Sequence, residues 1–294
     1  MELNKLIDGK NISAQIRDEI KTETEILKKE KGIIPGLAFI IAGEDPASKV
    51  YVKNKGKACE EAGFHSVTEV LPEGITEIQL LELIWKYNTD ENIHGILTQL
   101  PLPLHIDPQR VIEAIDPKKD VDGFHPVNVG KLSIGEKCFI PCTPYGIIEM
   151  LRRENIETSG KHAVILGRSN IVGKPVASLL LGKDMNSTVT VCHSRTTDIK
   201  KITSQADILI AAMGRADFVK KDFIKDGAVI IDVGINRVED ENKKSGYRIT
   251  GDVDFEDCIE KCSKITPVPG GVGPMTIAML LRNTLDSAKG EIYG

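Results

Sequence analysis

The sequence lacks the features that mark membrane, secreted and nucleic-acid-binding proteins. No apolar run approaches the length needed to cross a bilayer, and the polar residues 1–5 exclude the apolar core of a signal peptide. The net charge is -5 and the pI is about 5.8, so no basic surface for nucleic acid is expected. The chain also has no internal repeat and no low-complexity tract. These absences favour a cytoplasmic protein without a membrane or nucleic-acid partner.

Metal-binding and disulfide patterns are missing as well. None of the 6 cysteines forms a Cys-x-x-Cys pair, and no histidine cluster completes a zinc site. The pairs Cys138/Cys142 and Cys258/Cys262 are each four residues apart, and we interpret them as reduced structural thiols. We therefore expect no bound metal and a reducing compartment.

The chain alternates between helical and strand patterns, and its 294 residues are enough for two domains. In the first half we predict strands at 37–41, 67–71 and 94–98 and helices at 11–31, 47–62 and 76–87. In the second half we predict strands at 162–166, 187–192, 208–211 and 228–231, helices at 144–153, 174–182 and 275–288, and an exposed hairpin or loop at 239–246. This order predicts parallel sheets, which bind ligands at the carboxyl ends of their strands. We expect residues 43–48, 99–103 and 120–124 at those ends.

The stretch from Gly167 to Pro175 lies between a predicted strand and a predicted helix. That layout directs backbone N–H groups and a helix N-terminus at a phosphate. The stretch departs from the G-x-G-x-x-G fingerprint, because Ser169 replaces the second glycine and the last glycine comes one residue late. Spacing alone therefore leaves an ordinary strand-to-helix turn as an alternative.

The residues after the second strand of this half indicate which dinucleotide binds. An NAD site usually has a carboxylate there, but this chain has none until Asp198. Ser194 and Arg195 would instead suit a 2′-phosphate, and Arg168 adds a second cation. We therefore predict NADP rather than NAD, with a solvated surface role for Arg195 as the alternative.

Four polar residues of the first half could carry chemistry. Tyr51 and Lys55 share a helix face, and a desolvated lysine can exchange protons because burial disfavours its charged form. Gln99 follows a predicted strand and precedes two prolines, so its amide is held rigidly. Asp122 can pair with the N–H donors of an amino-pyrimidinone ring. The alternatives are a surface Tyr–Lys pair and a turn-forming aspartate before Gly123.

Six ordered motifs resemble one family. They lie at residues 51–55, 99–103, 119–123, 141–144, 167–175 and 267–276. Together they resemble the methylenetetrahydrofolate dehydrogenase/cyclohydrolase family, known as FolD. The similarity extends from Ile7 to the predicted C-terminal helix.

The resemblance implies two reactions in one cleft. NADP takes a hydride from 5,10-methylenetetrahydrofolate, and water then converts the methenyl product to 10-formyltetrahydrofolate. The implied catalytic residues are Lys55 as the acid–base group, Gln99 as its neighbour, Tyr51 as a stacking residue and Asp122 as the pterin anchor. The implied substrate-binding residues are Tyr51, Lys55, Gln99, Leu100, Asp122, Pro269, Gly270, Gly273 and Thr276. The implied cofactor-binding residues are Gly167, Arg168, Ser169, Val172, Gly173, Ser194, Arg195 and Ile235.

For two of these assigned binding regions, a structural role without ligand contact remains an alternative. The loop at 267–274 could be an interdomain connector without ligand contact, and Ile235 could be a buried residue at a strand end.

The expected fold is α/β with two domains. Residues 1–147 plus 273–294 are expected to form an α/β folate-binding domain, and 148–272 a Rossmann-like NADP-binding domain, with the C-terminal helix packing back on the first. The resemblance also implies a homodimer that acts in one-carbon metabolism and purine biosynthesis. Two other functions remain open from the residues: an NADP dehydrogenase of another small metabolite, such as a shikimate-type enzyme, and a non-catalytic NADP-binding regulator.

Overall fold

A computed structural model describes residues 3–43, 45–241, 243 and 246–293, except for the side chains of residues 3 and 46–50. Contacts between Cα atoms divide the chain into two compact units. Ala14–Cys142 and Ile277–Gly294 form one, which we call the Lys55 unit, and Met1–Ser13 and Thr143–Thr276 form the other, the Gly167 unit. The functional domain limits expected from the sequence stay a prediction.

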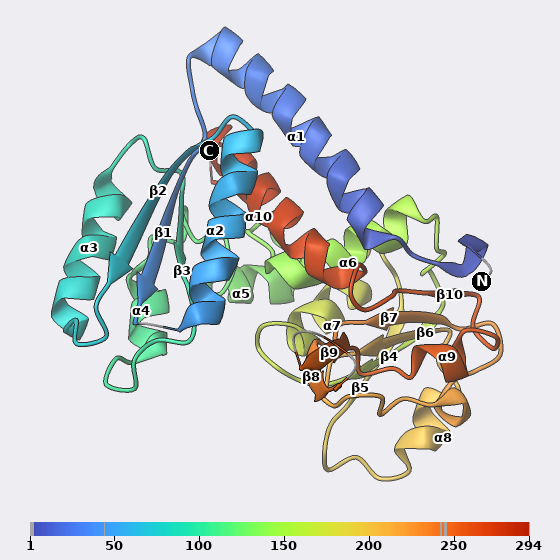
Figure 1. Cartoon of the computed structure of the whole chain (residues 1–294). Coiled ribbons are helices and arrows are strands. Elements are labelled where there is room, and N and C mark those ends of the chain that lie inside the picture. Colours follow the sequence, from blue (N-terminus) through green and yellow to red (C-terminus); the bar gives the residue numbers. More distant parts are fainter. Residues whose placement is uncertain (1–2, 44, 242, 244–245, 294) are drawn as a thin grey trace. The chain divides into compact units, whose positions relative to one another are not determined.

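The Lys55 unit is built on a three-stranded parallel sheet (Figure 1). In spatial order its strands are β2 (His65–Leu71), β1 (Gly36–Ala42) and β3 (Gly95–Thr98). Every residue of the central strand β1 is buried, as the apolar run at 37–41 predicts for a strand covered on both faces. The helices are α1 (Gly9–Lys31), α2 (Pro46–Glu61), α3 (Glu77–Thr89), α4 (Pro108–Ala114), α5 (Pro126–Ile134) and α10 (Val272–Ala288), the first and last of which begin in the Gly167 unit.

Side chains on one face of this sheet pack against two of these helices. Ala38 and Ile40 of β1 belong to an apolar cluster with residues of α3 and α4. The predicted helix at 76–87 begins with a capping box, for which Thr76 and Gln79 have the right spacing: the Thr76 hydroxyl accepts from the Gln79 backbone and the Gln79 side chain accepts from the Thr76 backbone.

The C-terminal helix α10 packs within the Lys55 unit, as expected. Asn283 Nδ2 donates to the carbonyls of Val121 (2.8 Å) and Ile140 (2.9 Å). Arg282 donates twice to the carboxylate of Glu23 on α1, at 2.9 and 2.8 Å. These contacts hold α10 against α1 and against the loop that contains Asp122.

The Gly167 unit contains a five-stranded parallel sheet. In spatial order its strands are β10 (Lys264–Ile265), β7 (Val229–Asp232), β6 (Ile208–Ala211), β4 (His162–Leu166) and β5 (Thr188–Cys192). The other elements are an antiparallel hairpin of β8 (Asn236–Glu239) and β9 (Tyr247–Thr250), helices α6 (Cys142–Arg153), α7 (Gly173–Leu181), α8 (Ile199–Thr203) and α9 (Phe255–Cys258), and 3-10 helices η1 (Leu3–Lys5) and η2 (Lys221–Phe223). Counted from β4, the strand order is 2-1-3-4-5. It reverses direction between β4 and β6, which is where doubly wound sheets bind ligands.

The structure corrects one expectation and adds elements that the sequence reading missed. Residues 120–124 do not follow a strand, because residues 108–114 form α4 and turns fill the chain from there to α5. The backbone at Lys119 nevertheless lies beside β3, since its carbonyl accepts from Ile96 N at 2.8 Å. The short helices α4, α5, α8 and α9 were not predicted.

Two expected absences concern membranes and metals. Among the described residues, no helix combines the length and the apolar character of a membrane span. Nor do His, Cys, Asp and Glu side chains gather there into a group that could hold a metal ion. All six cysteines are free and buried, consistent with structural thiols.

Candidate active site

Lys55 lies on α2 with its side chain almost completely buried, at 6% exposure. Its Nζ atom is 5.4 Å from the ring centroid of Tyr51, one helical turn earlier, so the two residues share a face as their spacing predicts. Lys53 and Lys57 of the same helix are exposed. Burial therefore distinguishes Lys55 from the lysines beside it.

Gln99 provides the hydrogen-bond partner of this lysine. Lys55 Nζ donates to Gln99 Oε1 at 3.1 Å, while Gln99 Nε2 donates to the Leu100 carbonyl at 2.8 Å. The backbone N–H of Gln99 donates to Ile40 O at 2.8 Å, which continues the pairing of β3 with β1 past the end of the strand. The amide is thus fixed with its oxygen toward Lys55.

Asp122 lies close enough to Lys55 to respond to its charge. Burial raises the pKa of Asp122, and the Lys55 charge and a hydrogen bond with the Cys142 thiol oppose that rise. The turn around Asp122 requires glycine next to it, because Gly123 has φ +72 and a Cβ there would lie 2.7 Å from Pro141 N. The structure therefore brings Tyr51, Lys55, Gln99 and Asp122 together in one unit.

Asp120 is a site residue that the sequence reading did not single out. It is 2% exposed and accepts hydrogen bonds from the backbone N–H groups of Phe124 and His125 and from Asn128 Nδ2. Burial raises the pKa of Asp120 to about 7, although these hydrogen bonds lower it. Asp120 thus fixes the loop that carries Asp122, and the Asp-x-Asp-Gly pattern was the available signal.

A small cavity of about 20 Å³ lies beside Asp122. Leu100, Phe124 and Asp120 are among its lining residues, and so is Thr98, whose Oγ1 is buried without a hydrogen-bond partner in the described part of the chain. That volume is enough for about one water molecule. Leu100, a predicted substrate-binding residue, therefore lines the same small cavity as Asp122.

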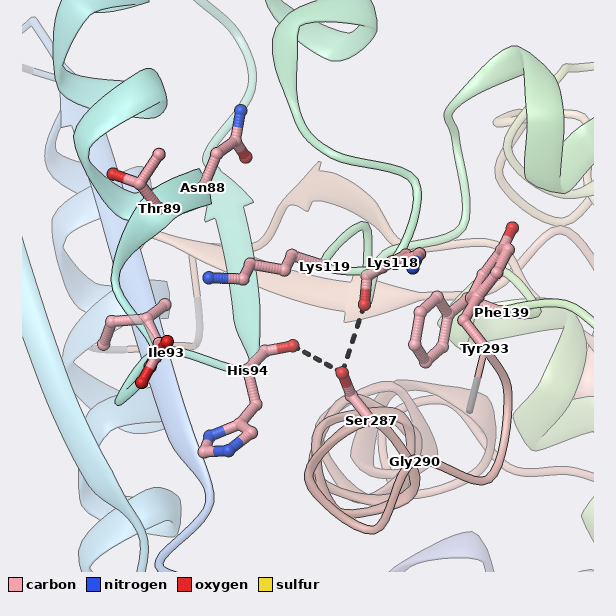
Figure 2. Close-up of a pocket in the computed structure, with 11 residues that line it drawn as sticks. Asn88, Thr89, Ile93, His94, Lys118, Lys119, Phe139, Ser287, Gly290 and Tyr293 are labelled. Carbon is pink, nitrogen blue, oxygen red and sulfur yellow. Dashed lines mark hydrogen bonds between the residues drawn. The ribbon is translucent and has the colours of Figure 1, made fainter.

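A larger cavity of about 310 Å³ lies at the opposite end of β3 from Gln99, beside His94 (Figure 2). Its polar groups are used to hold the fold together. The Ser287 hydroxyl of α10 hydrogen-bonds to His94 O (2.7 Å) and Lys118 O (3.2 Å), and Lys119 Nζ donates to two backbone carbonyls near the end of α3. None of the residues that line this cavity in the described part of the chain is a predicted site residue, and we assign the cavity no ligand.

In the Gly167 unit, the loop between β4 and α7 has the close packing of a phosphate-binding turn. Gly167 has φ +124, and a Cβ there would lie 2.2 Å from Ala212 O, while a Cβ on Gly173 would lie 2.3 Å from Gly167 O. The Ser169 hydroxyl accepts from the backbone N–H groups of Val172 (3.2 Å) and Gly173 (3.4 Å). The serine that departs from the fingerprint therefore shapes the loop from within, and the cradle between β4 and β6 fits a dinucleotide.

The residues predicted to bind the 2′-phosphate of the cofactor have exposed side chains. Arg168, Ser194 and Arg195 are exposed. The turn that carries Ser194 and Arg195 is held by the His193 ring, which accepts from Arg195 N at 3.1 Å, and by Thr196 Oγ1, which accepts from His193 N at 2.9 Å.

Ile235 follows β7 and is 61% exposed, so the alternative of a buried strand-end residue is wrong. Its side chain lies near Gly273, where an added Cβ would be 3.9 Å from Ile235 Cδ1. The loop before Gly273 is fixed by Lys10 N, which donates to Gly270 O at 2.9 Å. Thr276 is held by Thr143, with 3.1 Å between their hydroxyl oxygens. Pro269, Gly270, Gly273 and Thr276 thus belong to the same unit as the predicted cofactor residues.

Comparison with known proteins places these features in one family. Residues 7–122 match the family described as tetrahydrofolate dehydrogenase/cyclohydrolase, catalytic domain, and residues 141–292 match its NAD(P)-binding domain. The bifunctional protein FolD of Prosthecochloris aestuarii is 59% identical over 286 residues, which cover 96% of this chain and 97% of that protein. The FolD protein of Chloroherpeton thalassium is 60% identical over the same coverage.

Solved structures agree with this result. The FolD enzyme of Campylobacter jejuni has 51% identity and a TM-score of 0.92, with 97% of this chain and 99% of that chain covered. The FolD enzyme of Trypanosoma brucei, complexed with NADP cofactor and an inhibitor, has 41% identity and a TM-score of 0.92, with 98% of both chains covered. With its buried lysine–glutamine pair in one unit and its glycine-lined dinucleotide cradle in the other, the chain belongs to the tetrahydrofolate dehydrogenase/cyclohydrolase family.

Proposed function

We propose that this chain oxidises 5,10-methylenetetrahydrofolate with NADP and then hydrolyses the methenyl product to 10-formyltetrahydrofolate. The observation that carries the proposal is the hydrogen bond between the buried Lys55 and Gln99, beside Asp122, in a chain of this family. Methenyltetrahydrofolate is a cation, so a neutral lysine is a better neighbour for it than a charged one. Family membership excludes the shikimate-type alternative, and the bifunctional relatives exclude a non-catalytic regulator.

In the hydrolysis, Lys55 is the acid–base group. Its amine accepts a proton from the attacking water and returns a proton as the ring opens. Gln99 Oε1 orients the amine, because the other end of the amide is held by the Leu100 carbonyl. Tyr51 is 41% exposed and presents its ring beside the amine, which suits stacking on a pterin.

Asp122 anchors the pterin ring. Its carboxylate can accept two parallel N–H donors from the amino-pyrimidinone edge. Leu100 borders the same cavity as Asp122. The remaining substrate contacts, from Pro269, Gly270, Gly273 and Thr276, belong to the loop and helix start at 267–276.

The Gly167 unit binds NADP, which supplies the hydride acceptor when bound. Gly167, Ser169, Val172 and Gly173 form the tight turn that brings the start of α7 to the pyrophosphate. Arg168, Ser194 and Arg195 bind the 2′-phosphate, for which guanidinium and hydroxyl donors are well suited. Ile235 contributes an exposed apolar surface beside Gly273 against which the cofactor packs.

A spectroscopic assay tests the whole proposal. Purified protein with methylenetetrahydrofolate and NADP should develop methenyl absorbance, which should then decay as formyl product forms. Absence of any absorbance change would remove the dehydrogenase assignment, and a methenyl signal that decays no faster than without protein would remove the cyclohydrolase. Replacing NADP by NAD in the same assay tests the cofactor choice, because tighter binding of NAD would contradict the role given to Arg195.

The assembly is a homodimer that acts in the cytoplasm, in one-carbon metabolism and purine biosynthesis. In the described part of the Gly167 unit, β5 is an outer strand of its sheet, and Val191 on it is 38% exposed. An outer strand with free backbone groups is a natural site for pairing with another chain. Light scattering should therefore give about twice the chain mass of 32.2 kDa. A mass of a single chain at micromolar concentration would contradict the dimer.

A further inference from the structure

Two buried aspartates lie at the carboxyl edge of the five-stranded sheet, outside the set of predicted site residues. Asp232 is the last residue of β7 and is 3% exposed, and Asp252 follows β9 and is 0% exposed. Burial of a carboxylate is costly unless hydrogen bonds replace its water. Their partners are therefore informative about what they do.

Asp252 holds the loop that follows β6 by hydrogen bonds to its backbone. Its Oδ2 atom accepts from the backbone N–H groups of Met213 (2.5 Å) and Gly214 (2.9 Å), and its Oδ1 atom accepts from Arg215 N (2.8 Å). Oδ1 also accepts from Asn236 Nδ2, at the start of β8, at 2.9 Å. One carboxylate thus binds three consecutive backbone N–H groups and joins the loops that follow β6 and β7.

Asp232 connects the same region to β10. Its Oδ1 accepts from Gly234 N and Asp252 N, and its Oδ2 accepts from Val253 N, each at 2.9 Å. Its own N–H donates to Thr266 Oγ1 at 2.7 Å, directly before the loop at 267–274. Burial raises the pKa of Asp232 to about 7, against the three backbone hydrogen bonds that lower it.

Two glycines make room for the two carboxylates. A Cβ on Gly234 would lie 2.3 Å from Asp252 Oδ1, and a Cβ on Gly251 would lie 1.8 Å from Asp232 Oδ2. Neither glycine has a positive φ, so their backbone conformations are open to other residues. Space for the carboxylates, rather than backbone strain, is the reason for glycine at these positions.

The order of the strands shows which part of the cofactor these loops would meet. The pyrophosphate cradle follows β4, and the residues proposed for the 2′-phosphate follow β5, on one side of it. The nicotinamide half must then extend in the other direction, over β6 and β7. The loops held by Asp252 and Asp232 follow those strands, and Ile235 lies within one of them.

We propose that Asp252 and Asp232 are positioning residues for the nicotinamide half of the cofactor. Their carboxylates fix the loops at 213–215 and 233–236 by hydrogen bonds. This inference rests on the cofactor site proposed above and goes beyond it, since neither carboxylate touches the cofactor. Because hydrolysis of methenyltetrahydrofolate consumes only water, loss of either carboxylate should impair the dehydrogenase and leave the cyclohydrolase intact. The chain's two activities thereby provide an internal control.

The test compares Asp252→Asn with the wild type. Asparagine presents an NH2 group to N–H donors, so the loops should lose their fixed form. We expect the KM for NADP and the Kd for NADPH, the latter followed by its fluorescence, to rise about tenfold or more, as for loss of hydrogen bonds to a charged acceptor. The rate of methenyltetrahydrofolate hydrolysis should stay within about twofold of the wild type.

Gly251→Ala is the second variant, because it displaces the Asp232 carboxylate without changing it chemically. It should reproduce the selective loss, and it keeps the proposal testable if Asp252→Asn does not fold. Asp254→Asn is the matched control, since Asp254 lies two residues away in a partly exposed ion pair with Lys220, and it should retain wild-type NADP binding.

Two results would overturn the proposal while leaving the enzyme assignment in place. One is unchanged NADPH affinity in a folded Asp252→Asn protein. The other is an equal fall of both activities together with a lower Tm, which would indicate support of the whole fold rather than of the cofactor loops. Loss of both activities in the wild type would instead contradict the proposed function itself.

Discussion

Lys55 Nζ donates to Gln99 Oε1 at 3.1 Å, joining the middle of α2 to the carboxyl end of β3. The two residues are 44 positions apart, and each is held by a different element of the Lys55 unit. This pair gives the amine a fixed direction inside a nearly dry environment. Proton transfer by a buried, oriented amine is the chemistry that cyclohydrolysis needs.

Replacing Lys55 by methionine should abolish hydrolysis while NADP still binds. Methionine keeps the unbranched shape of the side chain, one atom shorter, but cannot exchange protons, so hydrolysis should fall roughly 10²- to 10⁴-fold. The measurement is the decay of methenyl absorbance, beside a binding titration with NADPH. Lys53→Met on the exposed side of the same helix is the control and should behave as the wild type. Retained hydrolysis in Lys55→Met would show that another group moves the proton.

Replacing Arg195 by alanine should weaken NADP binding selectively. The lost guanidinium contact to the 2′-phosphate should raise the KM for NADP by about tenfold to a hundredfold, while the KM for NAD, which lacks that phosphate, should not change. Lys201→Ala, which removes an exposed cation six residues later, serves as the control. Equal effects on NADP and NAD would assign Arg195 to the solvated surface role.

The buried carboxyl of Asp120 should make stability fall as the pH rises. Its pKa of about 7 exceeds the value of 3.8 expected when unfolded, so between these values the folded state keeps a proton that the unfolded state releases. The contribution of Asp120 is therefore favourable at low pH and is lost as the pH rises from about 4 to about 7. Urea denaturation at several pH values in this range measures how the free energy of unfolding depends on pH. A plot of that free energy against pH should have a less negative slope for Asp120→Asn than for the wild type. Identical slopes would contradict a raised pKa.

The ion pair between Arg282 and Glu23 should stabilise the packing of α10 on α1. Hydrogen bonding by Arg282 lowers the pKa of Glu23 to about 2, so this contribution is complete above about pH 4.5 and is lost as the pH falls toward 2. Arg282→Ala should lower the free energy of unfolding by about 1–3 kcal/mol at neutral pH. Arg152→Ala, in an exposed pair with Glu149, should cost less than about 1 kcal/mol. Equal effects of the two variants would show that α10 does not depend on this contact.

Local patterns predicted the elements and the local parts of the site. The apolar run at 37–41, the capping box at Thr76 and the glycine loop after β4 each depend on neighbours in sequence, and the structure has all three. The shared face of Tyr51 and Lys55 follows from helix geometry alone.

Partners distant in sequence could not be predicted in this way. Asp252 has the pattern of an ordinary turn aspartate, because its role depends on loops 16 or more residues away. Asp120 likewise depends on Asn128, whose side chain donates a hydrogen bond to its carboxylate. The exposure of Ile235 could not be predicted either, since an apolar residue after a buried strand is expected to be buried as well.

The helix α10 has a consequence for how the chain is made. The Lys55 unit begins at Ala14, yet its last helix is synthesised after the whole of the Gly167 unit. Asn283, which donates to the carbonyls of Val121 and Ile140, therefore reaches its partners late. On the ribosome, the unit whose sheet emerges first is completed last, and the turn at Asp122 gains its contacts with α10 only once that helix has emerged.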